Sequence, residues 1–160
     1  MIYLILVISF LLDNLISFFL NTNLLFNPLL SLVSLIIIFR YYHRKDENKY
    51  LITSFVLGLV YDIVCTDTIF LNAGIYLLLS LFIIKFYKIF SYNLLNSAIL
   101  LIIVIIIYRS ITFLVLSNFN FISFNLYHLL QSIYSSLILN LLYLSFFFLK
   151  KKKYKRYLQA

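Results

Sequence analysis

Long stretches without a charged residue constrain this chain more than any other feature. A helix needs about 20 mostly apolar residues to cross the hydrocarbon core of a membrane, which is about 30 Å thick. Charge-free runs that meet or approach this length occur at 14–39, 68–84, 89–108 and 110–149. The chain is 64% hydrophobic and only 11% charged, with a mean hydropathy of +1.06. Soluble proteins are about 45–50% apolar and about 25% charged, so an ordinary soluble domain is excluded and the surrounding solvent is lipid.

The apolar runs divide at clusters of polar and turn-forming residues. The first run breaks at 21–28, where Asn27 precedes Pro28, because proline is tolerated in the first turn of a helix and not in its interior. The last run breaks at 117–125, which is rich in Ser and Asn. We therefore predict an all-α integral membrane protein, a bundle of six transmembrane helices, with the third and fourth spans short. The expected spans are 2–20, 28–42, 50–65, 69–86, 94–116 and 127–149, forming one domain over 1–149 with a basic tail at 150–160.

The distribution of basic residues predicts the orientation of the bundle. All of the 13 Lys and Arg residues except Arg109 lie at the second connection, the fourth connection or the C-terminal tail. Cytoplasmic loops carry an excess of Lys and Arg, so both termini are expected in the cytoplasm. The net charge of +8 therefore indicates topology, and we predict no nucleic-acid partner. The tail at 150–156 is expected to bind anionic lipids, at about 1 kcal/mol per charge, and a protein partner is an additional possibility.

Polar residues inside the spans recur at i, i+4 and i+8, which keeps them on one helix face. In lipid, such faces hold helices together through small residues and interhelical hydrogen bonds. We interpret the faces as contacts within the bundle, and a substrate-lining role is the alternative. The four sets are Ser9, Asp13 and Ser17; Ser54, Gly58 and Asp62; Asn72, Tyr76 and Ser80; and His128, Ser132, Ser136 and Asn140.

Three ionisable residues, Asp13, Asp62 and Arg109, fall within or near the hydrophobic zone. A charge at the membrane centre costs roughly 2.5 to 3.5 kcal/mol, so each of the three needs a partner or a path to water. We predict an ion pair between Asp13 and Arg109, with Asp62 and Asp67 as competing partners and a proton or ion relay as the functional alternative. Both Asp13→Asn and Arg109→Leu are expected to lower the level of the protein in membranes.

No pattern typical of an enzyme, metal site or cofactor site is found. His43 and His128 are expected on opposite sides of the membrane, and Cys65 is the only cysteine and has no basic neighbour to activate it. The chain also lacks a phosphate-binding glycine loop. We predict a protein without catalytic residues, metal or cofactor.

The order of these features resembles the MreD rod shape-determining family over the whole chain. Asn27-Pro28 opens an apolar segment that ends in Arg40-Tyr41-Tyr42-His43-Arg44. A short charged loop follows, and then the segment 55–62, which carries a G-x-x-x-D element at Gly58 and Asp62. A polar turn then leads into Leu71-Asn72-Ala73-Gly74. The resemblance implies that Pro28 starts a helix, that Gly58 and Gly74 admit neighbouring helices closely, and that Asp62 anchors the outer end of a hairpin.

The resemblance also implies a function and a set of partners. It implies a non-enzymatic subunit of the bacterial cell-elongation complex in the cytoplasmic membrane. In such a complex it would bind MreC and link MreB filaments to lateral peptidoglycan synthesis by RodA and a penicillin-binding transpeptidase. The resemblance further implies a fold similar to the substrate-binding subunits of energy-coupling-factor importers.

Two other functions remain open from the residues alone. The first is the substrate-binding membrane subunit of a vitamin or ion importer, whose pocket needs several convergent polar groups. Candidates for such a pocket are Asp62, Asp67, Asn72, His128 and Gln131. The second is a small holin-like or pore protein.

Overall fold

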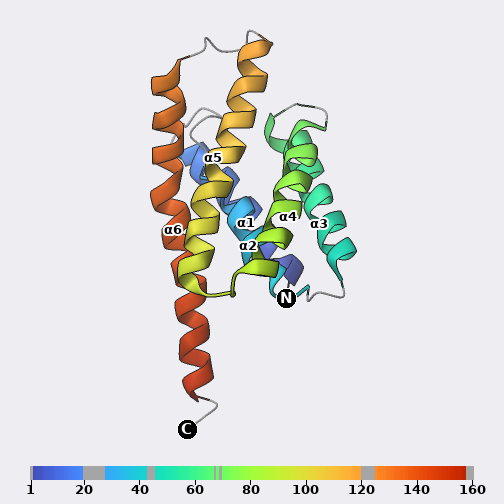
Figure 1. Ribbon diagram of the computed structural model, residues 1–160. Coiled ribbons are helices and arrows are strands. Elements are labelled where there is room, and N and C mark those ends of the chain that lie inside the picture. The colour runs from blue at the N-terminus through green and yellow to red at the C-terminus, as the bar shows by residue number, and fades with distance from the viewer. Residues whose placement is uncertain are drawn as a thin grey trace.

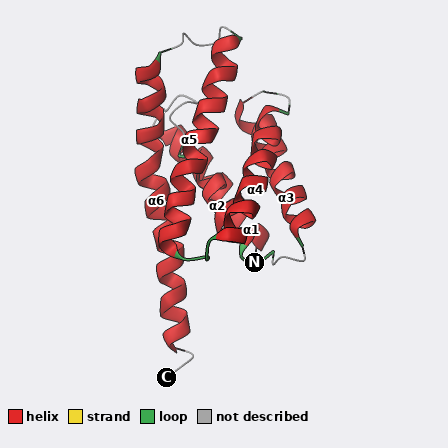
Figure 2. Ribbon diagram, viewed as in Figure 1, coloured by secondary structure: helices red, strands yellow, loops and turns green. Residues whose placement is uncertain are grey.

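The computed structural model describes residues 2–19, 28–42, 46–66, 68, 70–119 and 125–157, with side chains described for these except at residue 2 and beyond 149. These residues form helices and connecting turns, and no strand occurs among them (Figures 1 and 2). The elements are α1 (Ile2–Phe19), α2 (Leu30–Phe39), α3 (Glu47–Tyr61) with a π-helical turn η2 (Asp62–Thr66), α4 (Leu71–Ile89), α5 (Leu94–Asn118) and α6 (Leu126–Tyr157). The all-α fold expected from the sequence is confirmed.

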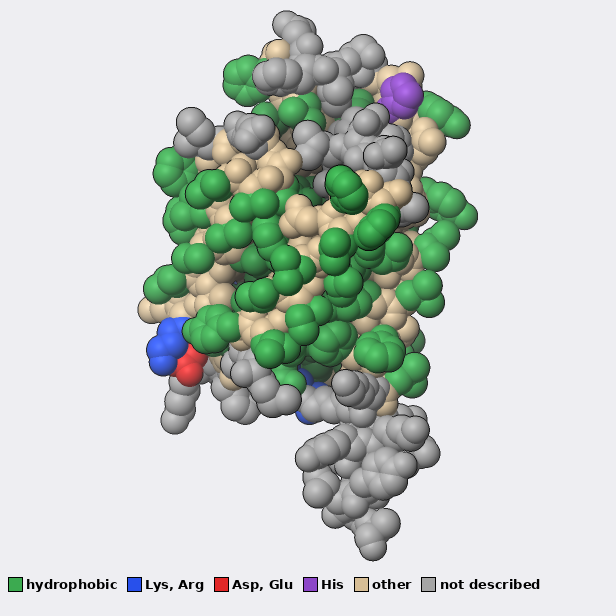
Figure 3. Space-filling view, turned by 180° about the vertical axis from the view of Figure 1, so that it is seen from behind, with side chains coloured by type: hydrophobic (Ala, Val, Ile, Leu, Met, Phe, Trp, Pro, Cys, Tyr) green, Lys and Arg blue, Asp and Glu red, His purple; other side chains and the backbone are tan. Residues whose placement is uncertain are grey.

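The protein is a multi-pass membrane protein. Four helical segments are long and apolar enough to cross a membrane, namely Glu47–Thr66, Leu71–Ile89, Leu94–Asn118 and Leu126–Leu149. Hydrophobic side chains cover the middle of the molecule, and the Lys, Arg, Asp and Glu side chains visible in this view gather at one end (Figure 3). This end carries the salt bridge between Lys88 and Glu47, and we call it the charged end. The first and last helices also begin and finish there (Figure 1).

The second helix differs most from the expected spans. We predicted a crossing over 28–42, but α2 has 10 residues and is about 15 Å long at 1.5 Å per residue. It begins two residues after Pro28, so the proline precedes the helix and does not occupy its first turn. Residues Leu30–Ile38 of α2 are all buried. α2 is therefore a half-length helix enclosed by its neighbours.

The third and fourth spans are not short, contrary to the prediction. α3 begins three residues before the expected start, and the π-turn continues it to Thr66, which gives a 20-residue segment. α4 has 19 residues. The sixth helix continues past the expected end at 149 to Tyr157, about 12 Å further, and extends beyond the other helices at the charged end (Figure 1).

The helices pack as successive hairpins, with α1 on α2, α3 on α4 and α5 on α6. α2 also contacts α4, α5 and α6, so it joins the three hairpins. The four predicted polar faces point mostly into the bundle, which supports their interpretation as contacts between helices. Ser9, Ser54, Tyr76, Ser80, Ser136 and Asn140 have no exposed surface, Asp62, Asn72 and Ser132 are 1% exposed, and Asp13 is 2% exposed, whereas His128 is exposed.

Candidate functional site

The buried carboxylate of Asp13 caps the start of α2. Its Oδ1 accepts a hydrogen bond from the backbone N–H of Leu30 at 2.6 Å, and its Oδ2 accepts one from Ser31 at 2.8 Å. The first N–H groups of a helix have no partner within the helix, and they carry the positive end of its dipole. Asp13 lies roughly 17 Å from the start of α1. The cap therefore holds the N-terminal end of α2, a half-length helix, well inside the bundle.

Asp62 caps the start of α4 in the same manner and with more donors. Its Oδ1 accepts the backbone N–H and the side-chain amide of Asn72, both at 2.9 Å, and its Oδ2 accepts the N–H of Ala73 at 3.0 Å. Thr68 Oγ1 donates to the same carboxylate, and so does Thr66 Oγ1 at 3.5 Å. Asp62 is the first residue of the π-turn. A π-turn inserts extra backbone into a helix and often marks a functional site.

The two caps share a backbone feature. The residue before each capped helix is a non-glycine in the left-handed region, Leu29 at φ 60° and Phe70 at φ 62°. Such a conformation costs roughly 1–2 kcal/mol for an L-residue and persists where the surroundings fix it. The α1–α2 and α3–α4 hairpins thus repeat one design, in which a buried aspartate on the first helix holds the start of the second.

Tyrosine hydroxyls connect the capped helices to the rest of the bundle. Ser31, whose N–H binds Asp13, also exchanges a hydrogen bond with the hydroxyl of Tyr76 at 2.7 Å. Tyr108 on α5 donates to Oδ1 of Asn72 at 2.7 Å, and the rings of Tyr76 and Tyr108 meet edge to face at 6.2 Å. Sequence analysis placed Tyr76 on an inward polar face, but it assigned no role to Ser31 or Tyr108. The sequence signal for their hydrogen-bonding roles is weak, because Ser and Tyr are frequent throughout this chain.

The predicted ion pair between Asp13 and Arg109 does not occur among the salt bridges of the described residues, and the partner of Arg109 stays a prediction. Both residues are described and each is 2% exposed, but no oxygen of Asp13 or Asp62 lies within 4.0 Å of the guanidinium. Both carboxylates accept hydrogen bonds from N–H groups at helix starts. The other predicted competitor, Asp67, lies outside the described residues.

The two glycines have different surroundings. A Cβ on Gly58 would lie 2.5 Å from Ala73 Cα and 2.7 Å from Asn72 O, so the absence of a side chain allows α3 to touch the backbone of α4. At Gly74, no atom of the described residues would lie within 4 Å of such a Cβ. Close approach of a neighbouring helix is thus seen at Gly58 and not, in the described part of the chain, at Gly74.

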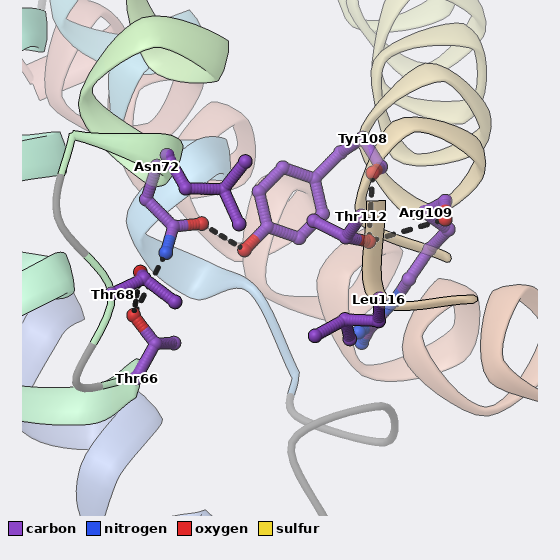
Figure 4. Close-up of a pocket in the computed structure, with 8 residues that line it drawn as sticks. Thr66, Thr68, Asn72, Tyr108, Arg109, Thr112 and Leu116 are labelled. Atoms are coloured by element: carbon purple, nitrogen blue, oxygen red, sulfur yellow. Dashed lines mark hydrogen bonds between the residues drawn. The ribbon is translucent and has the colours of Figure 1, made fainter. Parts of the chain in front are cut away.

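A small cavity adjoins the Asp62 cap, between the α3–α4 turn and α5 (Figure 4). It has a volume of about 50 Å³ and is lined by Thr66, Thr68, Leu71, Asn72, Tyr108, Arg109, Thr112 and Leu116. Of the pocket residues proposed for an importer, it includes Asn72 but not His128 or Gln131, which are exposed on α6. The structure therefore does not bring that predicted set together. Among the described side chains, no three of His, Cys, Asp and Glu gather where they could hold a metal ion.

Comparison with known proteins assigns the family. No curated protein and no solved structure matches the chain significantly, so similarity to importer substrate-binding subunits stays a prediction. One family model, described as rod shape-determining protein MreD, matches residues 1–153. This match includes all six helices except the last four residues of α6. The chain belongs to the MreD family of rod shape-determining membrane proteins.

Proposed function

We propose that this protein is a non-enzymatic scaffold of the bacterial cell-elongation complex. In this role it binds MreC and links MreB filaments to lateral peptidoglycan synthesis by RodA and a penicillin-binding transpeptidase. The observation that carries the proposal is the match to the MreD family over residues 1–153. A scaffold acts by binding alone, so its requirements are a stable bundle in the membrane and surfaces for partners.

The chemistry of the buried polar groups supports a structural role. The carboxylates of Asp13 and Asp62 accept hydrogen bonds from backbone N–H groups at the starts of α2 and α4. A catalytic or ion-relay carboxylate needs a face open to substrate or water, and each of these residues is at most 2% exposed. We assign both to holding helix starts, with Gly58 fixing the α3–α4 contact and Pro28 preceding α2.

The proposed location is the bacterial cytoplasmic membrane, with the charged end and both termini in the cytoplasm. The positive-inside rule supports this orientation, because the described Lys49 and Lys88 lie at the charged end with the C-terminal extension of α6. The bundle over 1–149 forms the membrane domain in this proposal, and the basic tail at 150–160 binds anionic lipids. The side chains of the tail lie outside the described residues.

The proposal is tested by affinity purification of the chain, tagged at its N-terminus, from native membranes in a mild detergent. Mass spectrometry should identify MreC together with RodA or a penicillin-binding protein. The Asp62→Asn variant, which weakens the α4 cap, should recover less of these partners per molecule of bait. The control Asp46→Asn changes a partly exposed aspartate at the N-terminal end of α3, which forms a salt bridge with Lys49, and it should recover as much as the natural chain.

The outcome also separates the scaffold from the alternative function. Recovery of paired ATPases with a large coupling subunit, in place of elongation proteins, would identify an importer subunit. Recovery of neither group under conditions that retain the folded bundle would contradict the scaffold proposal.

A further inference from the structure

One face of α4 lies away from the rest of the bundle. Gly74, Leu78, Leu81 and Lys85 follow one another at intervals of three or four residues, which keeps them on one side of the helix. Leu78 and Leu81 are 58% and 39% exposed, and Lys85 is exposed as well. The buried residues of α4 lie on its other side, where the helix packs on α2, α3 and α5. We call Gly74, Leu78, Leu81 and Lys85 the Gly74 face.

Gly74 leaves a notch in this face. A Cβ at Gly74 would have no described atom within 4 Å, and the side chains of Phe70 and Leu78, one turn before and after it, are 60% and 58% exposed. In a membrane, glycine allows the backbone of another helix to approach closely. Gly58 is used in this way, because a Cβ there would lie 2.5 Å from Ala73 Cα. The backbone of all six helices is described, and no other helix fills the notch at Gly74. A helix of another molecule therefore fits there.

A glycine that faces only lipid would lower the stability of α4 without a gain. Glycine in a helix interior costs roughly 1 kcal/mol relative to alanine, and an alanine at this position would meet no described atom within 4 Å. The chain has only two glycines, and the other one lies at a close contact between two helices. The position of Gly74 is thus explained by a close contact with a partner helix.

Lys85 supplies a charge at one end of the same face. It lies three turns after Gly74, about 17 Å along the helix, towards the charged end. Lys88, one turn further, pairs with Glu47 at 3.0 Å, whereas no carboxylate oxygen among the described residues lies within 4.0 Å of the Lys85 ammonium. A partner helix that runs along the Gly74 face therefore meets a cation there, and an acidic side chain complements it.

The same charge argues against a second copy of this chain as the partner. All copies have one orientation in the membrane, so two Gly74 faces would pack in parallel about a two-fold axis. Lys85 lies on the same side of α4 as Gly74, and the two Lys85 ammonium groups would therefore approach each other. Like charges placed together across an interface are unfavourable.

We propose that the Gly74 face binds a transmembrane helix of a partner protein, with Gly, Ala or Ser at the notch and Asp or Glu beside Lys85. The inference goes beyond the scaffold function, because it states a surface and the chemistry of the helix that it fits. The scaffold proposal concerns which proteins are recovered, and this inference concerns where one of them is held, so the two can fail separately.

The test is photo-crosslinking of the full chain in native membranes, with p-benzoylphenylalanine in place of Leu78. We expect an adduct with a peptide from a membrane-spanning segment of a different protein. This segment should carry a small residue within about two turns of the attachment site and an acidic residue about three turns nearer the charged end. The control places the same probe at Leu11 on α1, which is 52% exposed, and it should not capture this peptide.

Three outcomes of the crosslinking would overturn the proposal. The first is a peptide of this chain, which would identify a second copy. The second is an adduct with lipid alone or with a segment that lacks the small and acidic residues. The third is equal capture of the same peptide from Leu11.

Two variants test the notch and the charge separately. Gly74→Leu fills the notch and should reduce capture at position 78 by about tenfold, as overpacking of a close helix contact would. The unfolding temperature of this variant in detergent should not fall, because no described atom lies at the notch. Undiminished capture, or loss of capture only together with unfolding, would refute the role of Gly74.

Lys85→Glu should also reduce capture severalfold, and a change of the partner's acidic residue to lysine should restore it. The control Lys49→Glu reverses a charge at the same end of the molecule, on α3, where the side chain is 72% exposed, and it should leave capture unchanged. Equal effects of the two charge reversals, or no rescue by the partner's lysine, would refute the pairing at Lys85.

Discussion

At the scale of single residues, the carboxylates of Asp13 and Asp62 bind the N–H groups at the starts of α2 and α4, as a bound anion would. A helix start inside a membrane protein exposes several unpaired N–H groups to surroundings without water, which is costly. Membrane transporters use such half-helix starts to bind anionic substrates. Here the start of α2 holds the protein's own carboxylate at 2.6 and 2.8 Å. The position at which a substrate anion could bind is therefore filled.

We predict that Asp13→Ala destabilises the bundle and that formate restores part of the loss. The substitution removes the carboxylate and leaves a space of matching size at the two N–H groups. The expected loss is about 2–4 kcal/mol, because two charge-assisted hydrogen bonds disappear from a buried position. Thermal unfolding in detergent, with and without formate at equal ionic strength, measures both effects.

The control is Asp46→Ala. The side chain of Asp46 is 46% exposed, so this variant should keep the stability of the natural chain and should not be stabilised by formate. Equal stability of the natural chain and Asp13→Ala would show that the cap contributes nothing. Stabilisation of all three proteins by formate would show a general salt effect and no occupation of the vacated site.

The sequence predicted which acids are buried but not what they bind. The i, i+4, i+8 spacing placed Asp13 and Asp62 on inward faces, and both are buried. The sequence suggested Arg109 as the partner of these acids because opposite charge is the one kind of pairing that residue types reveal. A helix start is a backbone feature, and nothing in the residue types at 28–31 indicated that α2 begins beside Asp13.

At the scale of elements, the two glycines allow a matched comparison of helix packing. Gly58→Ala places a methyl 2.5 Å from Ala73 Cα, so α3 and α4 must separate. We predict a loss of about 1–3 kcal/mol, the usual cost of overpacking. Gly74→Ala meets no described atom within 4 Å and replaces a poor helix former by a good one, worth up to about 1 kcal/mol. In thermal unfolding, Gly58→Ala should therefore lower the unfolding temperature, whereas Gly74→Ala should raise it or leave it unchanged. Equal decreases in the two variants would contradict the prediction.

A second element-scale prediction concerns Tyr92, which holds the end of α2. Its hydroxyl donates to the carbonyls of Ile36 and Ile37 at 3.3 Å, and its ring stacks on Phe148 at 5.3 Å. Tyr92 is only partly buried, so Tyr92→Ala should lower the free energy of unfolding by about 2–3 kcal/mol, less than the roughly 3–5 kcal/mol of a fully buried aromatic. Tyr134→Ala, which changes a side chain 69% exposed on α6, should cost much less. A similar loss in the two variants would contradict the role of Tyr92.

The boundaries of most helices followed from the sequence, and α2 shows why one did not. Charge-free length and turn residues located the six helices to within a few residues, except that α6 continues through the basic tail. The segment 28–42 is as apolar as a span, yet α2 crosses only part of the bundle. Composition measures how apolar the surroundings of a segment are, and the interior of a membrane protein is as apolar as lipid. A buried half-helix and a full crossing therefore look alike in sequence.

At the scale of the whole molecule, α2 joins the three hairpins into one bundle. α3 packs mainly on α4, α6 packs mainly on α5, and α4 also contacts α5. α2 lies against α1, α4, α5 and α6, and its buried face includes Ser31, which bonds to Tyr76 on α4. Loss of either cap should therefore weaken contacts between hairpins as well as within them.

The orientation of the bundle gives the last prediction, which concerns both ends of the molecule at once. In a Cys65→Ser background, single cysteines are placed at Asn48, exposed at the charged end, and Asn118, exposed at the other. If the charged end is cytoplasmic, a membrane-impermeant maleimide applied to intact spheroplasts should label Asn118→Cys, while Asn48→Cys should react only after lysis. The unlabelled Cys65→Ser parent is the control. The reverse pattern would invert the topology, and it would place the partners of the charged end outside the cell, where cytoplasmic filaments cannot reach them.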